Sequence, residues 1–211
     1  SRKINDAMKL VVRNMVKDDV AFIFATGKSY YDEFISSIED LNLKPYQRVV
    51  PYLEDMANAL AASDLVIGSA GAISLAEITA LGKPSIIIPK AYTAENHQEY
   101  NAKSIEKQGA GVAILEKNLT DVSLNDAVTR LLGNREELLE MANKSKEIGK
   151  PEAIDLIYDE ILKIYNANNK EKLHKKESKK SKKEENTDTN VDLDKKEDTS
   201  SQGKVIGIKK K

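Results

Sequence analysis

The chain alternates helical segments with short apolar segments, and this alternation limits the folds open to it. Apolar residues at helical spacing from Ile4 to Met15 precede a continuous apolar run over residues 20–24, which is typical of a strand buried in a parallel sheet. The same order repeats four more times, so the sequence predicts an α/β fold with a Rossmann-like, doubly wound parallel sheet of about five strands. The expected strands cover residues 20–24, 48–50, 64–67, 85–88 and 112–115, and the expected helices cover residues 4–15, 30–41, 54–62, 71–81 and 97–108.

Three further helical segments, over residues 123–132, 135–148 and 151–165, are expected to close a domain of residues 1–168. Asn134 and the Lys150-Pro151 pair mark the breaks between them, because proline interrupts a helix. The last segment carries isoleucines at positions 154, 157, 161 and 164 on one helical face. We expect this face to pack on the sheet of its own domain or to cross to a partner domain.

Residues 169–211 differ in composition from the rest of the chain. From residue 170 onward there are 14 lysines against 9 acidic residues, whereas the preceding part holds 19 basic against 25 acidic residues. Such a segment buries too little apolar surface to offset the entropy of ordering, so a disordered tail is expected. A solvated appendage is the favoured role, with adhesion of its lysines to anionic lipid or to nucleic acid as the alternative. Nothing aromatic interleaves the lysines, so no nucleic-acid partner is expected.

Several classes of protein are excluded by residue types. The chain has no cysteine and two isolated histidines, His97 and His174, so neither a disulfide scaffold nor a zinc site is expected, and a reducing cytoplasm suits it. No apolar run approaches the roughly 20 residues that cross a bilayer, and no signal peptide precedes the fold. Any membrane contact is therefore expected to be peripheral. The chain opens at Ser1 directly into a helix, as expected of a piece of a longer protein.

The turn after the third expected strand is the first candidate site. Small residues fill positions 68–72, and a helix is expected to begin near Ile73 or Ser74, so unpaired N–H groups and a positive dipole end would face a ligand such as a diphosphate. Glu77 lies one turn further and can accept two hydrogen bonds from a ribose diol. The alternative is structural: Gly71 tightens the turn, and Glu77 is an acid favoured by the helix dipole.

A second polar segment, residues 97–102, follows the next strand. Gln98 and Asn101 are three residues apart, so they share a helical face, and their amides suit sugar hydroxyls. Surface decoration of a helix is the alternative. His97 is interpreted as a hydrogen-bonding or structural residue because no nucleophile accompanies it. Two such turns at the carboxyl ends of neighbouring strands predict a nucleotide pocket, whereas Glu54-Asp55 and Glu116-Lys117 are interpreted as ordinary caps and solvated charge.

Five segments together resemble the carboxyl-terminal half of the MurG family of GT-B glycosyltransferases. They are the segments 51–56, 62–67, 69–77, 82–89 and 97–102, and the resemblance extends from Arg2 to Tyr165. It implies a GT-B carboxyl-terminal domain that binds a nucleotide sugar. Members of this family transfer GlcNAc from UDP-GlcNAc to lipid I in peptidoglycan synthesis, forming lipid II with inversion at the anomeric carbon.

The resemblance also implies roles for single residues. The main chain of Leu53 would meet the uracil, Glu77 the ribose hydroxyls, and Gln98 with Asn101 the GlcNAc hydroxyls. The phosphates and sugar would lie at Ala72 to Ser74, within a substrate-binding set of Leu53, Ala72, Ile73, Ser74, Leu75, Ala76, Glu77, His97, Gln98 and Asn101. UDP-GlcNAc is a substrate, so no metal or other cofactor is expected. The implied place is the cytoplasmic face of a bacterial cell membrane, as a peripheral protein.

Three departures from the family pattern limit what this chain would do alone. The family has a glycine-rich phosphate loop immediately before the position of Arg2, and a lipid I-binding domain with a candidate base further upstream. Neither feature is expected within the 211 residues. Ser69 stands where many relatives have arginine. The chain alone is therefore expected to bind donor weakly and to transfer nothing. Alternatives are another GT-B lipid glycosyltransferase, a donor-binding subunit of a two-chain UDP-GlcNAc transferase, and a purely structural Rossmann-like module.

Overall fold

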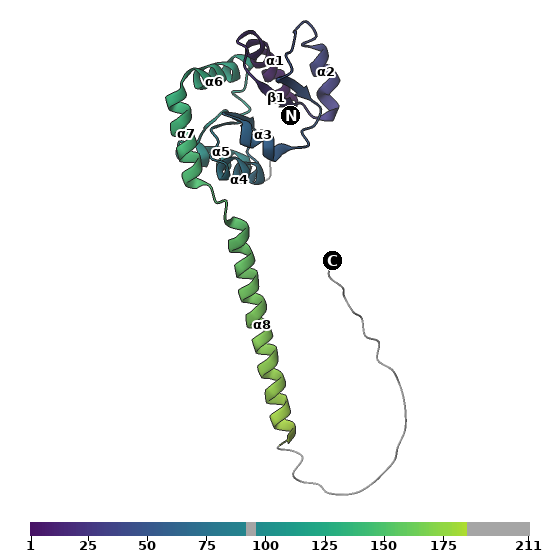
Figure 1. The fold of residues 1–211 in the computed structure, drawn as a ribbon, viewed down its shortest axis with the longest axis vertical. Coiled ribbons are helices and arrows are strands. Elements are labelled where there is room, and N and C mark those ends of the chain that lie inside the picture. Colours follow the sequence, from purple (N-terminus) through teal and green to yellow (C-terminus); the bar gives the residue numbers. More distant parts are fainter. Residues whose placement is uncertain (92–95, 185–211) are drawn as a thin grey trace, which may run out of the picture. The chain divides into compact units, whose positions relative to one another are not determined.

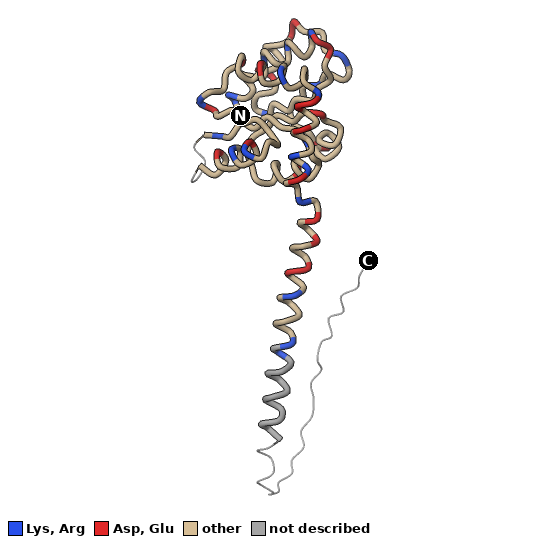
Figure 2. Tube along the Cα trace, turned by 90° about the vertical axis from the view of Figure 1, so that its left-hand side faces the viewer, with Lys and Arg blue, Asp and Glu red and all other residues tan. Residues whose placement is uncertain are grey.

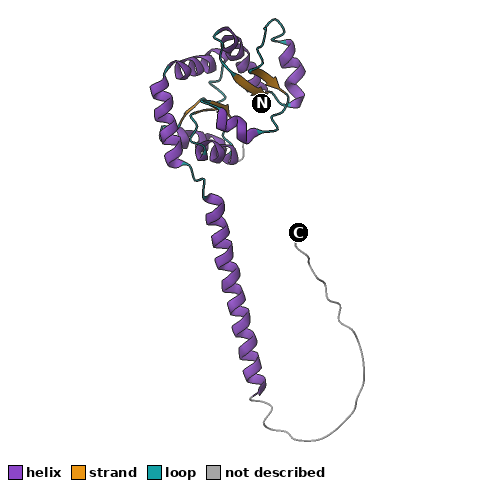
Figure 3. Ribbon diagram, viewed as in Figure 1, coloured by secondary structure: helices purple, strands orange, loops and turns teal. Residues whose placement is uncertain are grey.

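A computed structural model describes residues 1–91 and 96–184 of the chain. Helices and strands alternate through the amino-terminal part, and α6, α7 and α8 follow the last described strand (Figure 1; Figure 3). The strands are β1 (Phe22–Ala25), β2 (Gln47–Val50), β3 (Val66–Gly68), β4 (Ser85–Ile87) and β5 (Gly111–Ala113). The helices are α1 (Arg2–Lys17), η1 (Lys28–Tyr30), α2 (Tyr31–Ser36), α3 (Met56–Ala62), α4 (Ala72–Ala80), α5 (His97–Lys107), α6 (Asp121–Gly133), α7 (Arg135–Ile148) and α8 (Ala153–Glu184).

All five expected strands are present and every pairing among them is parallel. They form two sheets rather than one: β1 pairs with β2, and β3, β4 and β5 pair in that order. The expectation of parallel, alternating α/β structure is confirmed, whereas a single continuous five-stranded sheet is not observed. β1 and β3 each have one strand neighbour among the described residues, so no ladder of hydrogen bonds joins the two sheets.

The core lies where the sheets meet the helices. Ile86 and Ile88 are at most 1% exposed and share one apolar cluster with Val11 and Val12 of α1. Helix α1 also packs against α6, where Asn14 donates a hydrogen bond to Asn125 Oδ1 at 2.7 Å. Burial of strands on both faces explains the apolar runs in the sequence, although β2 and β4 also bury the polar residues Gln47 and Ser85.

Side-chain caps fix several helix boundaries close to where the sequence predicts them. The Asp55 carboxylate accepts hydrogen bonds from the Asn58 side-chain amide and from the Asn58 N–H at the start of α3, and these two bonds lower the pKa of Asp55. Thr120 and Ser123 form a capping box on α6, a motif that satisfies two free N–H groups at once. Asn134 caps α7, so the predicted break at that residue is confirmed.

Helix α2 is shorter than the predicted helix over residues 30–41. The Ser37 hydroxyl donates to the Phe34 carbonyl at 2.7 Å, and the Arg13 guanidinium donates to the Ser37 carbonyl at 2.8 Å. These two bonds satisfy carbonyl groups that would otherwise accept from the next helical turn. Beyond Ser36 the N–H groups of Ile38 and Leu41 donate to carbonyls three residues earlier, so the α-helical pattern of hydrogen bonds ends there.

The chain divides into two compact units, Ser1–Ile154 and Asp155–Lys211. Helix α8 continues through Glu184, so residues 169–184 of the expected disordered tail are helical. Lysine and glutamate have high helix propensity, which accounts for the difference. Residues 185–211 of that expectation lie outside the described residues. Ile154, Ile157, Ile161 and Ile164 of α8 are exposed, and their packing against a partner domain stays a prediction. Among the described residues, no helix has the length and apolar character needed to span a bilayer.

Replacing Gly111 by alanine is expected to destabilise the first unit by about 1 to 3 kcal/mol. A Cβ atom at this position would lie 2.8 Å from both Ser85 O and Ser85 Oγ and 3.1 Å from the Ile105 side chain. Since Ser85 is buried opposite Gly111 in the β4–β5 ladder, the neighbouring strand must shift. Urea unfolding measures the change.

The matched control is Gly68→Ala on β3, where a Cβ atom would meet nothing within 4 Å. Its expected effect is within about 0.5 kcal/mol of zero. Equal losses for the two variants would contradict the steric explanation.

Candidate functional site

The turn between β3 and α4 presents an open helix start. Because β3, β4 and β5 are parallel, their carboxyl ends meet at one edge, which is where α/β proteins bind ligands. Helix α4 begins after Gly71 without a side-chain cap, and a Cβ atom on Gly71 would find only Ser74 Oγ, at 3.9 Å. The first N–H groups of α4 therefore face a space that small residues leave clear.

Helix α5 lies against this turn through one hydrogen bond and a small apolar contact. Asn101 Nδ2 donates to the Ala70 carbonyl at 3.1 Å. Ala70 and Ala102 are fully buried in one cluster with Leu75 and Ile87. The structure thus brings together the two segments that the sequence singled out, residues 68–77 and 97–102.

The predicted residues of α4 differ in what they can offer a ligand. Leu75 is 7% exposed and belongs to the core, and its N–H donates to the Gly71 carbonyl. Glu77 is exposed, and its carboxylate has no hydrogen-bond or ion-pair partner among the described residues. The other predicted positions on this helix, Ala72, Ile73, Ser74 and Ala76, are exposed as well. Glu77 is therefore a carboxylate free to accept hydrogen bonds from outside the protein.

The polar side chains of α5 already have structural partners. Gln98 Oε1 accepts a hydrogen bond from the Lys90 N–H at 3.0 Å, so it fixes the chain just after β4. Lys103 donates to Glu99 at 2.5 Å, and this bond lowers the pKa of Glu99. His97 is exposed at the first position of the helix. Gln98 and Asn101 retain Nε2 and Oδ1, respectively, for hydrogen bonding to a ligand.

Leu53 follows a strand of a different sheet from the strands that precede the other predicted site residues. It follows β2, which belongs to the two-stranded sheet, whereas the turns before α4 and α5 follow strands of the three-stranded sheet. Its side chain is half-buried, and the adjacent Tyr52 is 65% exposed. No hydrogen bond among the described residues joins Leu53 to α4 or α5.

A cavity of about 300 Å³ lies beyond the carboxyl ends of β4 and β5. Glu116 is one of its lining residues, and the interpretation of Glu116 as solvated charge is wrong. The Glu116 side chain is 14% exposed, accepts from the Ala91 N–H at 2.9 Å and lies 3.9 Å from Lys3 Nζ. Its position directly after the fifth predicted strand is the sequence feature that could have indicated a place at this edge of the sheet. The lining residues are Pro89, Lys90, Ala91, Asn96, Glu99, Leu115, Glu116 and Lys117.

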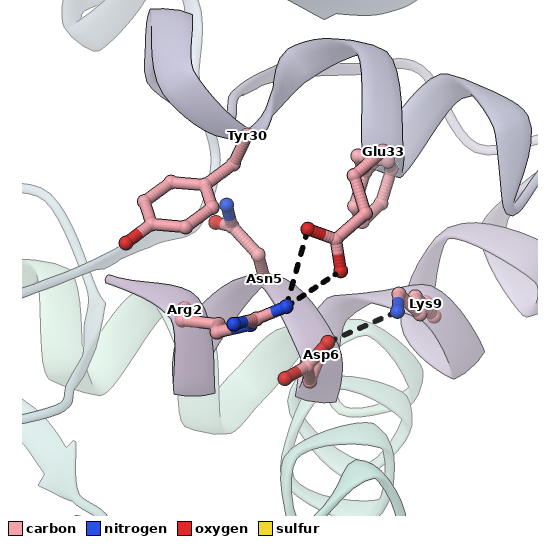
Figure 4. A pocket seen from close by; sticks show the side chains of 7 residues that line it. Arg2, Asn5, Asp6, Lys9, Tyr30 and Glu33 are labelled. Atoms are coloured by element: carbon pink, nitrogen blue, oxygen red, sulfur yellow. Dashed lines mark hydrogen bonds and ion pairs between the residues drawn. The ribbon is translucent and has the colours of Figure 1, made fainter.

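A second, much smaller cavity lies between α1 and α2 (Figure 4). Its volume of about 10 Å³ corresponds to a single water molecule. Arg2 donates to both oxygens of Glu33, at 3.2 and 3.4 Å, and Lys9 pairs with Asp6. The charged groups around this cavity thus neutralise one another, so it is not a candidate ligand site.

Comparison with known proteins identifies the family. The pattern described as "Glycosyltransferase family 28 C-terminal domain" matches residues 1–157. The chain belongs to this family. Over its whole length the chain is 75% identical to the UDP-N-acetylglucosamine--N-acetylmuramyl-(pentapeptide) pyrophosphoryl-undecaprenol N-acetylglucosamine transferase of Clostridioides difficile. The chain covers 51% of that protein. The protein of the same description from Acetivibrio thermocellus is 48% identical over 70% of this chain and 40% of its own length.

The fold of this family 28 domain is similar to a solved MurG structure. The crystal structure of Acinetobacter baumannii MurG matches with a TM-score of 0.65 and 27% identity, over 77% of this chain and 46% of that one. The resemblance to the MurG family and the GT-B carboxyl-terminal fold expected from the sequence are confirmed. The chain spans about half the length of the curated relatives it matches.

Replacing Asn101 by alanine is expected to lower the free energy of unfolding by about 0.5 to 1.5 kcal/mol, the typical net worth of a hydrogen bond. The variant leaves the Ala70 carbonyl without its side-chain donor. Urea unfolding and hydrogen exchange of α5 amides measure the effect. Tyr100→Ala is the control, because Tyr100 is 74% exposed on the same helix. Unchanged protection of α5 in the Asn101 variant would show that the bond does not hold the helix.

Proposed function

We propose that the chain is the donor-binding part of a bacterial transferase that moves GlcNAc from UDP-GlcNAc to lipid I, with residues 1–168 as the donor domain. The observation that carries the proposal is the uncapped start of α4 beside the small-residue turn, with exposed Glu77 one turn inside it. Family 28 membership and 75% identity to the C. difficile transferase support the same substrate class. UDP-GlcNAc is the substrate, and no cofactor is part of the proposal.

The proposed donor site assigns one chemical group to each part of the nucleotide sugar. The diphosphate lies at the N–H groups of Ala72 to Ser74, since a helix start favours anions. Glu77 accepts from both ribose hydroxyls, and the main chain of Leu53 meets the uracil. Gln98 Nε2 and Asn101 Oδ1 are the remaining amide atoms, and in this proposal they bond the sugar hydroxyls. The main-chain groups of Leu75 and Ala76 border the phosphates, and His97 borders the sugar.

The proposed reaction is a displacement with inversion. The C4 hydroxyl of the lipid I sugar attacks the anomeric carbon of GlcNAc, the bond from that carbon to the UDP oxygen breaks, and the hydroxyl proton passes to a base. UDP leaves with additional negative charge on its diphosphate. Fixed N–H dipoles at the start of α4 stabilise that charge without having to reorganise. Lipid I is membrane-borne, so the proposal places the protein peripherally at the cytoplasmic face of the membrane.

The rest of the catalytic machinery is proposed to come from additional polypeptide. The chain covers 51% of its C. difficile relative, which leaves room for an acceptor domain and its base. The order β2-β1 in one sheet and β3-β4-β5 in the other matches the order 3-2-1-4-5-6 of a doubly wound sheet with one position unfilled. A parallel strand between β1 and β3, ending in a glycine-rich loop before α1, would fill that position.

Replacing Glu77 by alanine in the full-length polypeptide is expected to weaken UDP-GlcNAc binding by about 1 to 3 kcal/mol, the range for a hydrogen bond to a charged group. Isothermal titration calorimetry measures the affinity, and UDP measured in parallel separates nucleotide contacts from sugar contacts. Because the ribose belongs to both ligands, the loss should be equal for the two.

The matched control for that variant is Glu136→Ala, which removes an exposed carboxylate near the start of a different helix, α7. Its UDP-GlcNAc affinity should equal that of the parent protein. An unchanged affinity in the Glu77 variant would refute the role of Glu77 in donor binding.

A further inference from the structure

The segment after β4 leaves the sheet at Ile88. The N–H of Ile88 donates to the Gly68 carbonyl of β3 at 2.8 Å, and the next residue, Pro89, has no N–H to donate. Beyond this point the β3–β4 ladder of hydrogen bonds has ended, yet main-chain N–H groups of a folded protein need partners. Those partners have to come from side chains or from water.

Two side chains are the partners of the next two N–H groups. Gln98 Oε1 accepts from the Lys90 N–H at 3.0 Å, and Glu116 Oε2 accepts from the Ala91 N–H at 2.9 Å. Gln98 lies in the first turn of α5, whereas Glu116 follows β5. Because the two N–H groups belong to consecutive residues, a shift of one peptide group displaces the other. The position of the Gln98 amide is therefore coupled to the bond that Glu116 makes.

Burial distinguishes Glu116 from the other carboxylates of the first unit. Acidic and basic residues are interspersed along this unit (Figure 2), so charge alone does not single it out. The Glu116 side chain is 14% exposed, whereas the other carboxylates in ion pairs of the described residues are 29% to 65% exposed. Burying a carboxylate costs free energy unless hydrogen bonds offset it.

The Ala91 N–H is the main partner of the Glu116 carboxylate. Lys3 Nζ lies 3.9 Å from Glu116 Oε2, which is longer than a hydrogen bond, and the Lys3 side chain is 61% exposed. Ion pairs of exposed side chains contribute little because water and salt screen them. The hydrogen bond to the main chain therefore accounts for the position of Glu116 better than the ion pair does.

We propose that Glu116 is a positioning residue for the sugar part of the donor site. It acts on the Gln98 amide through the peptide groups of Lys90 and Ala91. The inference rests on the proposed function, in which Gln98 Nε2 bonds a sugar hydroxyl. Because Oε1 and Nε2 belong to one planar amide, holding Oε1 on the Lys90 N–H also sets the direction of Nε2. The contacts proposed for the diphosphate, the ribose and the uracil do not involve this segment.

Replacing Glu116 by alanine in the full-length polypeptide tests the proposal. The variant should bind UDP-GlcNAc about three- to tenfold more weakly than the parent, the range for one hydrogen bond. Its affinity for UDP should stay within about twofold of the parent, because UDP lacks the sugar. Isothermal titration calorimetry measures both ligands. An equal loss for the two ligands, or no loss for either, would overturn the proposal.

Two further variants test how Glu116 acts. Glu116→Gln keeps an oxygen that can accept from the Ala91 N–H, so its UDP-GlcNAc affinity should return to within about twofold of the parent. Glutamine as weak as alanine would assign the effect to the charge beside Lys3 and overturn the proposal. In a Gln98→Ala background, Glu116→Ala should cost less than about twofold more, because residues that act through one another are not additive. A full additional loss would show that Glu116 does not act through Gln98.

The matched control is Glu106→Ala. Glu106 Oε1 accepts from the Ala113 N–H at 2.9 Å, so this variant removes the same kind of bond between a carboxylate and the main chain, away from residues 90 and 91. Its affinities for UDP-GlcNAc and UDP should stay within about twofold of the parent. Urea unfolding compares the stability of the two alanine variants. A loss specific to UDP-GlcNAc in the Glu106 variant would show that general loosening is sufficient.

Amide hydrogen exchange tests the positioning without any donor, on the 211-residue chain. In Glu116→Ala, the Lys90 and Ala91 amides should both exchange at least about fivefold faster, because local opening becomes easier. Faster exchange at Ala91 alone would overturn the coupling to Gln98.

The two sets of measurements distinguish this inference from the proposed function. UDP-GlcNAc binding by the parent, with an unchanged affinity in Glu116→Ala, would overturn this inference alone. Absence of UDP-GlcNAc binding by the parent, with faster exchange at both amides in the variant, would count against the proposed function alone.

Discussion

Burial of β4 is the constraint on which the candidate site depends. Ile86, Ile87 and Ile88 are at most 1% exposed, so this strand has to lie between neighbours and beneath helices. Parallel pairing with β3 and β5 then places three carboxyl ends at one edge, and the turns that follow β3 and β4 become neighbours. Exposing the isoleucines of β4 to water would cost free energy, so β4 stays buried between β3 and β5. The N–H groups at the start of α4 and the amides of α5 therefore share that edge.

Hydrogen bonding at this edge divides between structure and potential ligand contact. Gln98 uses Oε1 to hold the chain after β4, and Asn101 uses Nδ2 to hold the turn before α4. An amide has both donor and acceptor atoms, so each residue can fix the backbone with one atom and keep the other for a ligand. Glu77 differs from these two amides because its carboxylate has no hydrogen-bond or ion-pair partner among the described residues. The edge therefore combines amides already held in place with one carboxylate that has no partner among the described residues.

Helix α8 extends the family 28 domain with surface chemistry of a different kind. The first unit buries a core that includes Ile86, Leu124 and Leu131, whereas Ile157, Ile161 and Tyr165 of α8 are more than half exposed.

Sequence alone determined the alternation of helices and strands, because apolar runs and helical spacing report which faces must leave water. It also identified residues 68–77 and 97–102 and the family, since turn chemistry and motif spacing are local properties. Tertiary structure decided the rest. The separation into two sheets, the burial of Leu75 and the internal partners of Gln98, Asn101 and Glu116 arise from contacts beyond immediate sequence neighbours. Local patterns do not encode which long-range partner a polar atom finds, because that depends on how the elements pack.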